Sequence, residues 1–132
     1  MSLTRVSDVF RSYSNVVAAY VFGSRARGDF REDSDWDIGV LLLQGFDPRD
    51  FLEFLEDLRG ALGVDFEKLN LAVLNDVDID FAFQILSEGK LIYQKDPDLR
   101  SDLEVSIIKR YIDAKPLLEL RRKRLEELYG LG

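Results

Sequence analysis

Apolar residues recur along the chain with two different spacings, which separate the expected helices from the expected strands. A spacing of three or four residues is typical of one face of a helix, whereas a short continuous apolar run is typical of a buried strand. The helical spacing covers residues 3–14, 48–62, 79–87 and 101–129. The continuous runs cover residues 16–22, 36–43, 64–69 and 91–93. Strands that alternate with helices in this way predict a small α/β (α+β) domain.

Glycine and proline residues mark the boundaries between these segments. The apolar pattern is interrupted at Gly45 to Pro48, Gly63, Gly89 and Asp96-Pro97. Pro116 lies inside the last helical segment, where it removes a backbone hydrogen bond and must kink or split the helix. No repeat, low-complexity tract or linker separates the segments. We therefore expect a single domain, with a core over residues 1–98 and a C-terminal helical tail over residues 99–132.

Composition restricts the chemistry that the chain can perform. Its 132 residues are 46% hydrophobic and 33% charged, which is typical of one folded globular domain. The sequence contains no cysteine and no histidine. Disulfides, thiolate metal sites and histidine bases are therefore excluded. Any catalysis must use carboxylates, hydroxyls, lysine, arginine or tyrosine.

The charge balance is acidic, with a formal net charge of -7 and a pI near 4.6. This argues against direct nucleic-acid binding, because contact with a phosphate backbone needs clustered lysine and arginine. The one basic run, Arg121 to Arg124, is followed by Glu126 and Glu127, so we interpret it as a solvated helix face or a protein-docking patch. The sequence shows no secretory signal and no apolar stretch of about 20 residues. We expect a cytoplasmic protein without a membrane span.

Two acidic residues, Asp35 and Asp37, stand at the head of the apolar run Ile38 to Leu43. Side chains at positions i and i+2 of a strand share a face, so we expect the two carboxylates to project together. Nearby carboxylates repel each other unless a cation lies between them. Oxygen ligands of this kind suit Mg²⁺, which takes one or two protein carboxylates and completes its shell with water and substrate phosphate. The pair therefore predicts a magnesium site.

A Gly-Ser turn follows the first predicted strand and begins a short predicted helix. Gly23 permits a tight turn and a close approach of the backbone. Amides at a helix start attract anions, and the Ser24 hydroxyl can donate to a phosphate oxygen. Arg27, one helical turn later, is placed to reach the same phosphate. We interpret Arg25, in contrast, as a solvated loop charge.

Each of these features alone is more often structural than catalytic. A Gly-Ser pair fits many strand-to-helix turns, and aspartate favours turns and helix caps. In combination they indicate function, because two like charges at the start of an apolar strand would be unfavourable in a strand that had only a structural role. The sequence therefore predicts a phosphate-binding turn beside a metal-binding pair.

The stretch GSRARGDFREDSDWDIGVLL resembles the signature of the DNA polymerase beta-like nucleotidyltransferase superfamily, and most closely its minimal nucleotidyltransferase (MNT) branch. The resemblance rests on the Gly-Ser turn, the arginine, the Ser-Asp-x-Asp sequence and the apolar strand behind it, in that order and spacing. It implies the nucleotidyltransferase fold, which is a small mixed sheet with helices on one side. A C-terminal helical tail is also implied.

A third carboxylate on a neighbouring strand is also implied by the resemblance, and Asp65 is the matching position. Its competitors are Glu67, on the same face of the predicted strand, and Asp78 or Asp80 before the next helix. We interpret the last two as helix-capping acids.

The implied site divides into two groups of residues. The catalytic and metal-binding residues, which would hold one or two Mg²⁺ ions, are Asp35, Asp37 and Asp65. The third of these would complete a second metal site or take a proton from the acceptor. The nucleotide-binding residues, which would hold the β and γ phosphates, are Gly23, Ser24 and Arg27.

The implied reaction moves a nucleoside monophosphate, AMP from ATP, onto a hydroxyl group with release of pyrophosphate. Stand-alone MNT proteins are similar in size and are antitoxins paired with HEPN-domain toxins, and some adenylylate a tyrosine of that partner. We therefore expect a HEPN toxin as acceptor, with docking or self-association into a homo-oligomer through the tail after Pro116. The alternatives are an antitoxin that acts by binding alone, and transfer to a small molecule such as an aminoglycoside.

Overall fold

The computed structural model describes residues 3–130. Its helices and strands are, in chain order, α1 (Leu3–Ser12), β1 (Val16–Phe22), α2 (Ser24–Arg27), β2 (Trp36–Leu42), α3 (Pro48–Leu62), the 3₁₀ turn η1 (Phe66–Lys68), β3 (Leu69–Val73), α4 (Ile79–Glu88), β4 (Lys90–Gln94) and α5 (Pro97–Tyr129). Within residues 3–130, no helix is long and apolar enough to cross a membrane.

The four strands form one mixed sheet in the order β3-β2-β1-β4. Strand β1 is antiparallel to both β2 and β4, whereas β2 and β3 run parallel. The small mixed sheet expected from the resemblance is therefore confirmed. In this register Asp37 of β2 lies opposite Phe22 at the end of β1 and opposite Asn70 of β3. The ends of three segments thus meet at one place on the sheet.

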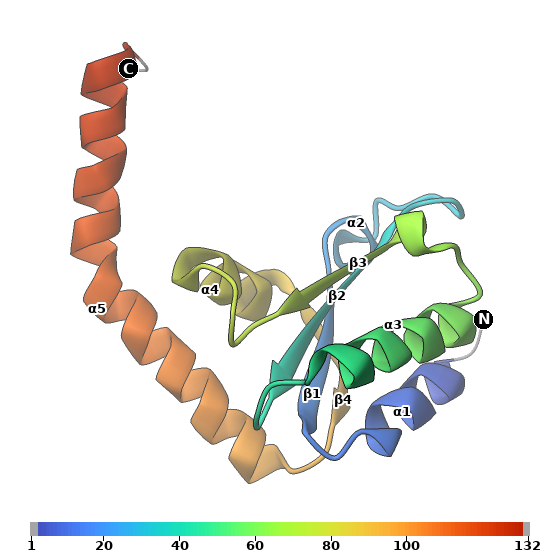
Figure 1. Cartoon of the computed structure of the whole chain (residues 1–132). Coiled ribbons are helices and arrows are strands. Elements are labelled where there is room, and N and C mark those ends of the chain that lie inside the picture. Colours follow the sequence, from blue (N-terminus) through green and yellow to red (C-terminus); the bar gives the residue numbers. More distant parts are fainter. Residues whose placement is uncertain (1–2, 131–132) are drawn as a thin grey trace.

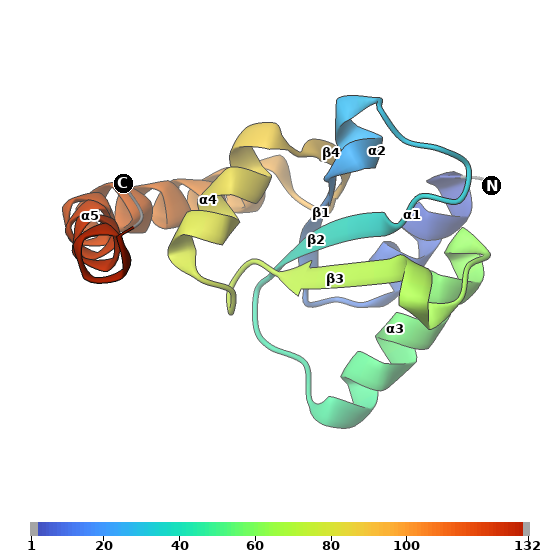
Figure 2. The ribbon, with the colours of Figure 1, turned by 90° about the horizontal axis from the view of Figure 1, so that it is seen from above.

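Helices cover both faces of the sheet, with α1 and α3 on one side and α4 and α5 on the other (Figures 1 and 2). Phe10 and Phe54 fill the core beneath α1 and α3, and Ile85 and Ile107 fill the core beneath α4 and α5. The expectation of helices on one side only is therefore wrong. Every residue of β1 up to Val21 is buried, and a strand with both faces buried needs cover on both sides.

The predicted helices and strands are confirmed except for the third strand, which was placed too early. Helix α3 ends at Gly63 in the left-handed conformation. The chain then forms η1, closed by the Lys68 amide donating to the Asp65 carbonyl at 2.9 Å. Pairing with β2 begins only at Leu69. The strand therefore covers residues 69–73 rather than 64–69.

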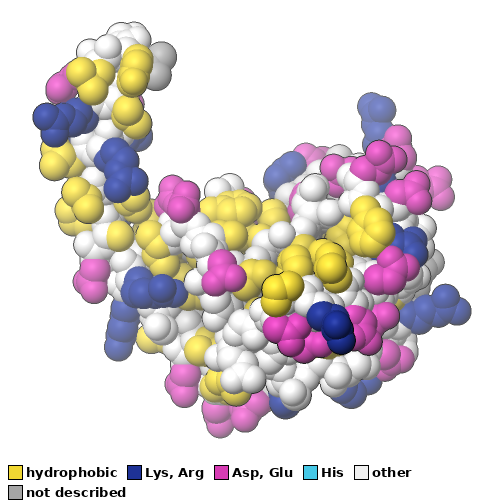
Figure 3. Space-filling view, in the orientation of Figure 1, with side chains coloured by type: hydrophobic (Ala, Val, Ile, Leu, Met, Phe, Trp, Pro, Cys, Tyr) yellow, Lys and Arg dark blue, Asp and Glu magenta, His cyan; other side chains and the backbone are white. Residues whose placement is uncertain are grey.

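Helix α5 runs without a break past Pro116 and bends along its length, so the expected effect is a kink rather than a split (Figure 1). Its first half packs on α4 and β1, where Ile107 is buried. Its second half, residues 117–129, stands away from the sheet, and we call it the arm. Large apolar side chains of the arm are exposed: Leu117, Leu120, Leu125, Leu128 and Tyr129. Figure 3 shows apolar and basic side chains side by side along it.

The buried phenol of Tyr20 links β1 to α5 by a hydrogen bond. We expect this bond to make the stability of the protein fall at alkaline pH. Its hydroxyl donates to Glu104, which also accepts from Arg100 at 2.8 Å. Burial, followed by the bond to Glu104, raises the pKa of Tyr20 far above its usual value of 10.0. The contribution of this phenol is therefore complete below about pH 10 and is lost as the pH rises further.

We expect Tyr20→Phe to cost about 1 kcal/mol at pH 7 and to flatten the decline of stability above pH 10. Urea unfolding of both proteins between pH 7 and 12 measures the effect. The stability of the variant should still fall in part at high pH because of Tyr13, since burial and the hydrogen bond to Asp57 also raise the pKa of its phenol. Parallel curves for the two proteins would contradict the assignment to Tyr20.

Candidate active site

The two aspartates at the head of β2 lie together, as their spacing predicts. Asp37 is the second residue of β2 and is half-buried, while Asp35 precedes the strand and is exposed. The side-chain amide of Asn70 donates to both, at 3.3 Å to Asp35 Oδ2 and 2.9 Å to Asp37 Oδ1. The ammonium group of Lys68 lies 3.9 Å from Asp35 Oδ1. One amide thus reaches both carboxylates, and a cation of the chain lies beside the outer one.

The turn at Gly23 passes directly against this pair. Gly23 has φ 69° and ψ -150°, and a Cβ atom there would lie 2.1 Å from Asp37 Oδ2. A residue with a side chain cannot occupy this position without moving the carboxylate or the turn. The predicted short helix follows as α2, whose first turn is closed by the amides of Ala26 and Arg27 on the Gly23 carbonyl. The phosphate-binding candidate and the metal-binding candidate are therefore neighbours.

Ser24 and Arg27 lie on α2, one turn apart. Ser24 is the first residue of the helix and is half-buried. Arg27 is exposed and pairs with Asp29 across 3.4 Å. Both residues remain candidates for contact with an anion at Gly23, because a pair this exposed holds the arginine only weakly.

The interpretation of Arg25 as a solvated loop charge is wrong. Its guanidinium lies 4.8 Å from the ring centroid of Phe30 and 4.0 Å from that of Trp36. It donates to the backbone carbonyls of Glu32 at 3.2 Å and Ser34 at 2.9 Å. Arg25 therefore fastens the loop that leads into Asp35. The aromatic residues on either side of that loop were the signal available in the sequence.

Asp65 does not occupy the place expected for a third carboxylate on a strand. It precedes η1 as the N-cap residue, and the β3 residue that faces Asp37 is Asn70. Among residues 3–130, no three acidic side chains gather into a group that could hold a metal. The strand placement on which the choice of Asp65 rested is therefore wrong.

The competing acids also lie elsewhere. Glu67 is exposed on η1. Asp78 is the N-cap residue of α4, but its side chain makes no capping hydrogen bond. Asp80 lies in the first turn of α4 and accepts from the Phe81 amide at 3.0 Å. Sequence reasoning missed Asn70 because it searched for a third acid rather than an amide.

A cavity of about 200 Å³ opens beside the turn, between α2 and α4. Its lining residues are Phe22, Gly23, Arg27, Phe81, Gln84, Ile85 and Glu88. The rings of Phe22 and Phe81 meet edge to face at 5.7 Å, which gives the cavity an aromatic wall. It therefore combines an apolar surface with polar groups next to the candidate phosphate turn.

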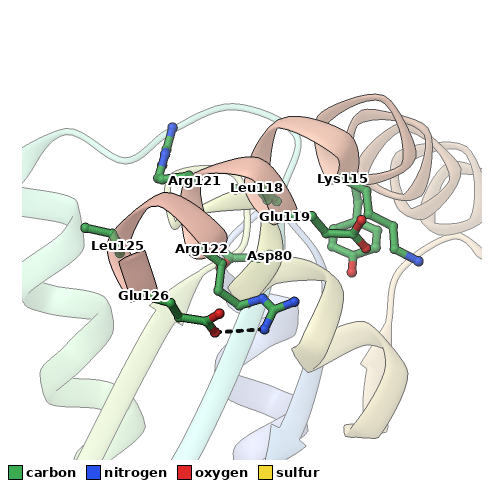
Figure 4. Close-up of a pocket in the computed structure, with 9 residues that line it drawn as sticks. Asp80, Lys115, Leu118, Glu119, Arg121, Arg122, Leu125 and Glu126 are labelled. Carbon is green, nitrogen blue, oxygen red and sulfur yellow. Dashed lines mark hydrogen bonds and ion pairs between the residues drawn. The ribbon is translucent and has the colours of Figure 1, made fainter. Parts of the chain in front are cut away.

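A second cavity, of about 600 Å³, is separate from the aspartates and lies along α5. Figure 4 shows Lys115, Leu118, Arg122 and Leu125 of α5, which line it together with Asp80 of α4. Arg122 pairs there with Glu126 across 3.0 Å. This cavity is a groove on the arm rather than part of the candidate active site.

The donor set at the aspartates fits a small divalent cation. Asp35 and Asp37 supply carboxylate oxygens from one face, and Asn70 carries an amide oxygen on the adjoining strand. Mg²⁺ prefers oxygen donors and keeps several sites for water or phosphate. Asp35 and Asp37 are the residues that would hold such an ion.

Known proteins resemble this chain in sequence and in fold. The family model for the polymerase beta nucleotidyltransferase domain matches residues 4–98. A solved structure of a putative minimal nucleotidyltransferase is 30% identical, covers 68% of this chain and 95% of that chain, and has a TM-score of 0.55. Among curated protein sequences, none matches the chain.

Two solved toxin–antitoxin complexes contain chains with the same fold. A chain of a toxin–antitoxin with AMP-PNP is 22% identical, with a TM-score of 0.76 over 97% of this chain and 98% of that chain. A chain of the complex between a tri-AMPylated Shewanella oneidensis HEPN toxin and its MNT antitoxin is 20% identical, with a TM-score of 0.69 over 96% and 94%. With its matching core and its Gly-Ser turn set against paired aspartates, the chain belongs to the polymerase beta nucleotidyltransferase family.

Proposed function

We propose that the protein is a Mg²⁺-dependent nucleotidyltransferase that moves AMP from ATP onto a hydroxyl group of a partner protein. The observation that carries this proposal is the contact between Gly23 and Asp37, which sets a turn that can bind phosphate against a pair of carboxylates. A triphosphate bound at the turn would thus lie beside a cation held by the aspartates. The site combines the two elements that phosphoryl transfer needs, namely positioning and charge stabilisation.

The residues around the turn divide the work of holding the nucleotide. Ser24 and the amides of the turn donate to the β and γ phosphates, and Arg27 adds a positive charge. Asp35 and Asp37 hold the cation, which when bound supplies charge neutralisation for the triphosphate and for the leaving pyrophosphate. Arg25 keeps Asp35 in place through the loop carbonyls. The cavity beside Phe81 is close enough to the turn to receive the nucleoside.

The exposed surface of the arm favours a protein as acceptor. The arm carries exposed apolar side chains and a basic run, a combination suited to docking a second protein (Figure 3). One of the solved complexes of the same fold contains a HEPN toxin with an MNT antitoxin, and the toxin in it is tri-AMPylated. We therefore infer an antitoxin role toward a HEPN toxin, in the cytoplasm where ATP is available.

Intact-mass analysis of a partner toxin tests the proposal. A candidate HEPN toxin is incubated with the full chain, Mg²⁺ and each NTP in turn. We expect the mass of the toxin to rise by one or more AMP units with ATP and to stay unchanged with Asp37→Asn. Toxin activity that is silenced without any adduct, by wild type and variant alike, would identify an antitoxin that acts by binding alone. An adduct on an aminoglycoside but not on protein would identify a small-molecule transferase.

A further inference from the structure

The residue that faces the aspartate pair across the parallel strands is an amide rather than an acid. Asn70 lies opposite Asp37 in the register between β2 and β3, so the two side chains are on the same face of the sheet. Its Nδ2 atom donates to Asp37 Oδ1 at 2.9 Å and to Asp35 Oδ2 at 3.3 Å. A single side chain thus bridges the two carboxylates that the proposed function assigns to the metal.

The bridge offsets the repulsion that the two acids would otherwise exert on each other. Two groups of the chain provide compensating polarity, namely the Asn70 amide and the Lys68 ammonium at 3.9 Å from Asp35. A cation between the carboxylates would take the place now served by the amide hydrogens. The carboxamide has two ends, and its oxygen is as suitable for Mg²⁺ or Ca²⁺ as a backbone carbonyl.

We infer that Asn70 is the third metal-binding side chain of this site. Its Nδ2 atom donates to the aspartates when they hold no cation, and its Oδ1 atom turns toward the cation when one is bound. This inference rests on the proposed function. The site then carries two negative charges instead of three. A site of that charge binds one free cation weakly and gains affinity when a nucleotide brings further phosphate oxygens.

Mn²⁺ binding tests this inference independently of catalysis. The full chain is titrated with Mn²⁺ in the absence of nucleotide, and the free ion is measured by electron paramagnetic resonance. We expect Asn70→Asp to bind Mn²⁺ about tenfold more tightly than wild type, because it adds a charge to the site. Asn70→Leu keeps the branched shape and removes both polar atoms, so we expect about tenfold weaker binding. If leucine disturbs the fold, as judged by circular dichroism, Asn70→Ala serves the same purpose.

A matched control separates the site from the overall charge of the protein. Asn15→Asp adds the same charge before β1, at the end of that strand opposite to Gly23, and is expected to bind Mn²⁺ as wild type does. The rise in melting temperature caused by Mg²⁺ should follow the same order, with Asn70→Asp above wild type and Asn70→Leu below it.

Two outcomes overturn the inference. Unchanged or tighter Mn²⁺ binding by Asn70→Leu would mean that the amide only competes with the cation, and unchanged binding by Asn70→Asp would mean that position 70 does not reach it. Failure of the proposed function is distinguishable, because it would appear as equal Mn²⁺ binding by wild type and Asp37→Asn, with and without a nonhydrolysable ATP analogue.

Discussion

Replacing Asp37 by asparagine should lower the rate of nucleotide transfer by at least about a thousandfold, while the fold is kept. The loss corresponds to about 4 kcal/mol of transition-state stabilisation, within the range expected when a metal ion loses a charged ligand. The carboxylate is half-buried at the end of a strand, and asparagine has nearly the same shape. The cost in stability should therefore be about 0.5 kcal/mol or less.

The measurement combines initial rates of transfer from labelled ATP with thermal melting of the same samples. Asp35→Asn should behave like Asp37→Asn, since both carboxylates contact the same amide. Asp33→Asn is the matched control, because it removes an exposed acid from the same loop without touching the pair. Equal activity of Asp37→Asn and Asp33→Asn would remove the basis of the metal assignment.

The part of the site that could be predicted from the sequence is the part that depends on local geometry. The alternation of side chains in a strand is fixed by the backbone, so the spacing of Asp35 and Asp37 was enough to place them on one face. A glycine between an apolar strand and a helix likewise requires a turn at Gly23. These features needed no knowledge of which strands pair with each other.

The partner of the aspartates could not be predicted in the same way, because it comes from strand pairing. Three residues of η1 delay the start of β3, and this delay decides whether position 65 or position 70 faces Asp37. A strand can begin anywhere within an apolar stretch, so a short apolar run does not fix its first paired residue. The amide at position 70 also gave no signal to a search for carboxylates.

The presence of helices on both faces of the sheet could, in contrast, be predicted from the sequence. Residues 16–22 form an uninterrupted apolar run, and such runs are typical of strands buried on both sides. The resemblance to the superfamily, in contrast, implies helices on one side of the sheet only. The consequence for the site is substantial, because α4 lies on the face to which Asp37 points. Gly39 of β2 lets α4 approach closely, since a Cβ there would lie 3.0 Å from Ile85.

Gly23→Ala should reduce transfer by about a hundredfold or more, because the new methyl group would overlap Asp37 Oδ2 at 2.1 Å. The carboxylate or the phosphate turn must then move by more than an ångström, and a displacement of that size separates the metal from the nucleotide. The backbone at φ 69° and ψ -150° also disfavours alanine, so we expect a loss of about 1–3 kcal/mol in stability. Initial rates and urea unfolding measure the two effects separately.

Gly28→Ala shows which of these effects comes from the site. Gly28 also has a positive φ, 83°, but a Cβ there would meet nothing within 4 Å. Both variants place alanine at a positive φ, but the strain is smaller at Gly28, whose ψ of 4° belongs to the left-handed helical region, and only Gly23→Ala places a methyl group against the carboxylate. We expect a smaller loss of stability in Gly28→Ala than in Gly23→Ala, with near-normal transfer. If transfer falls equally in the two variants, backbone strain explains the loss, and contact between the turn and Asp37 is not what the chemistry requires.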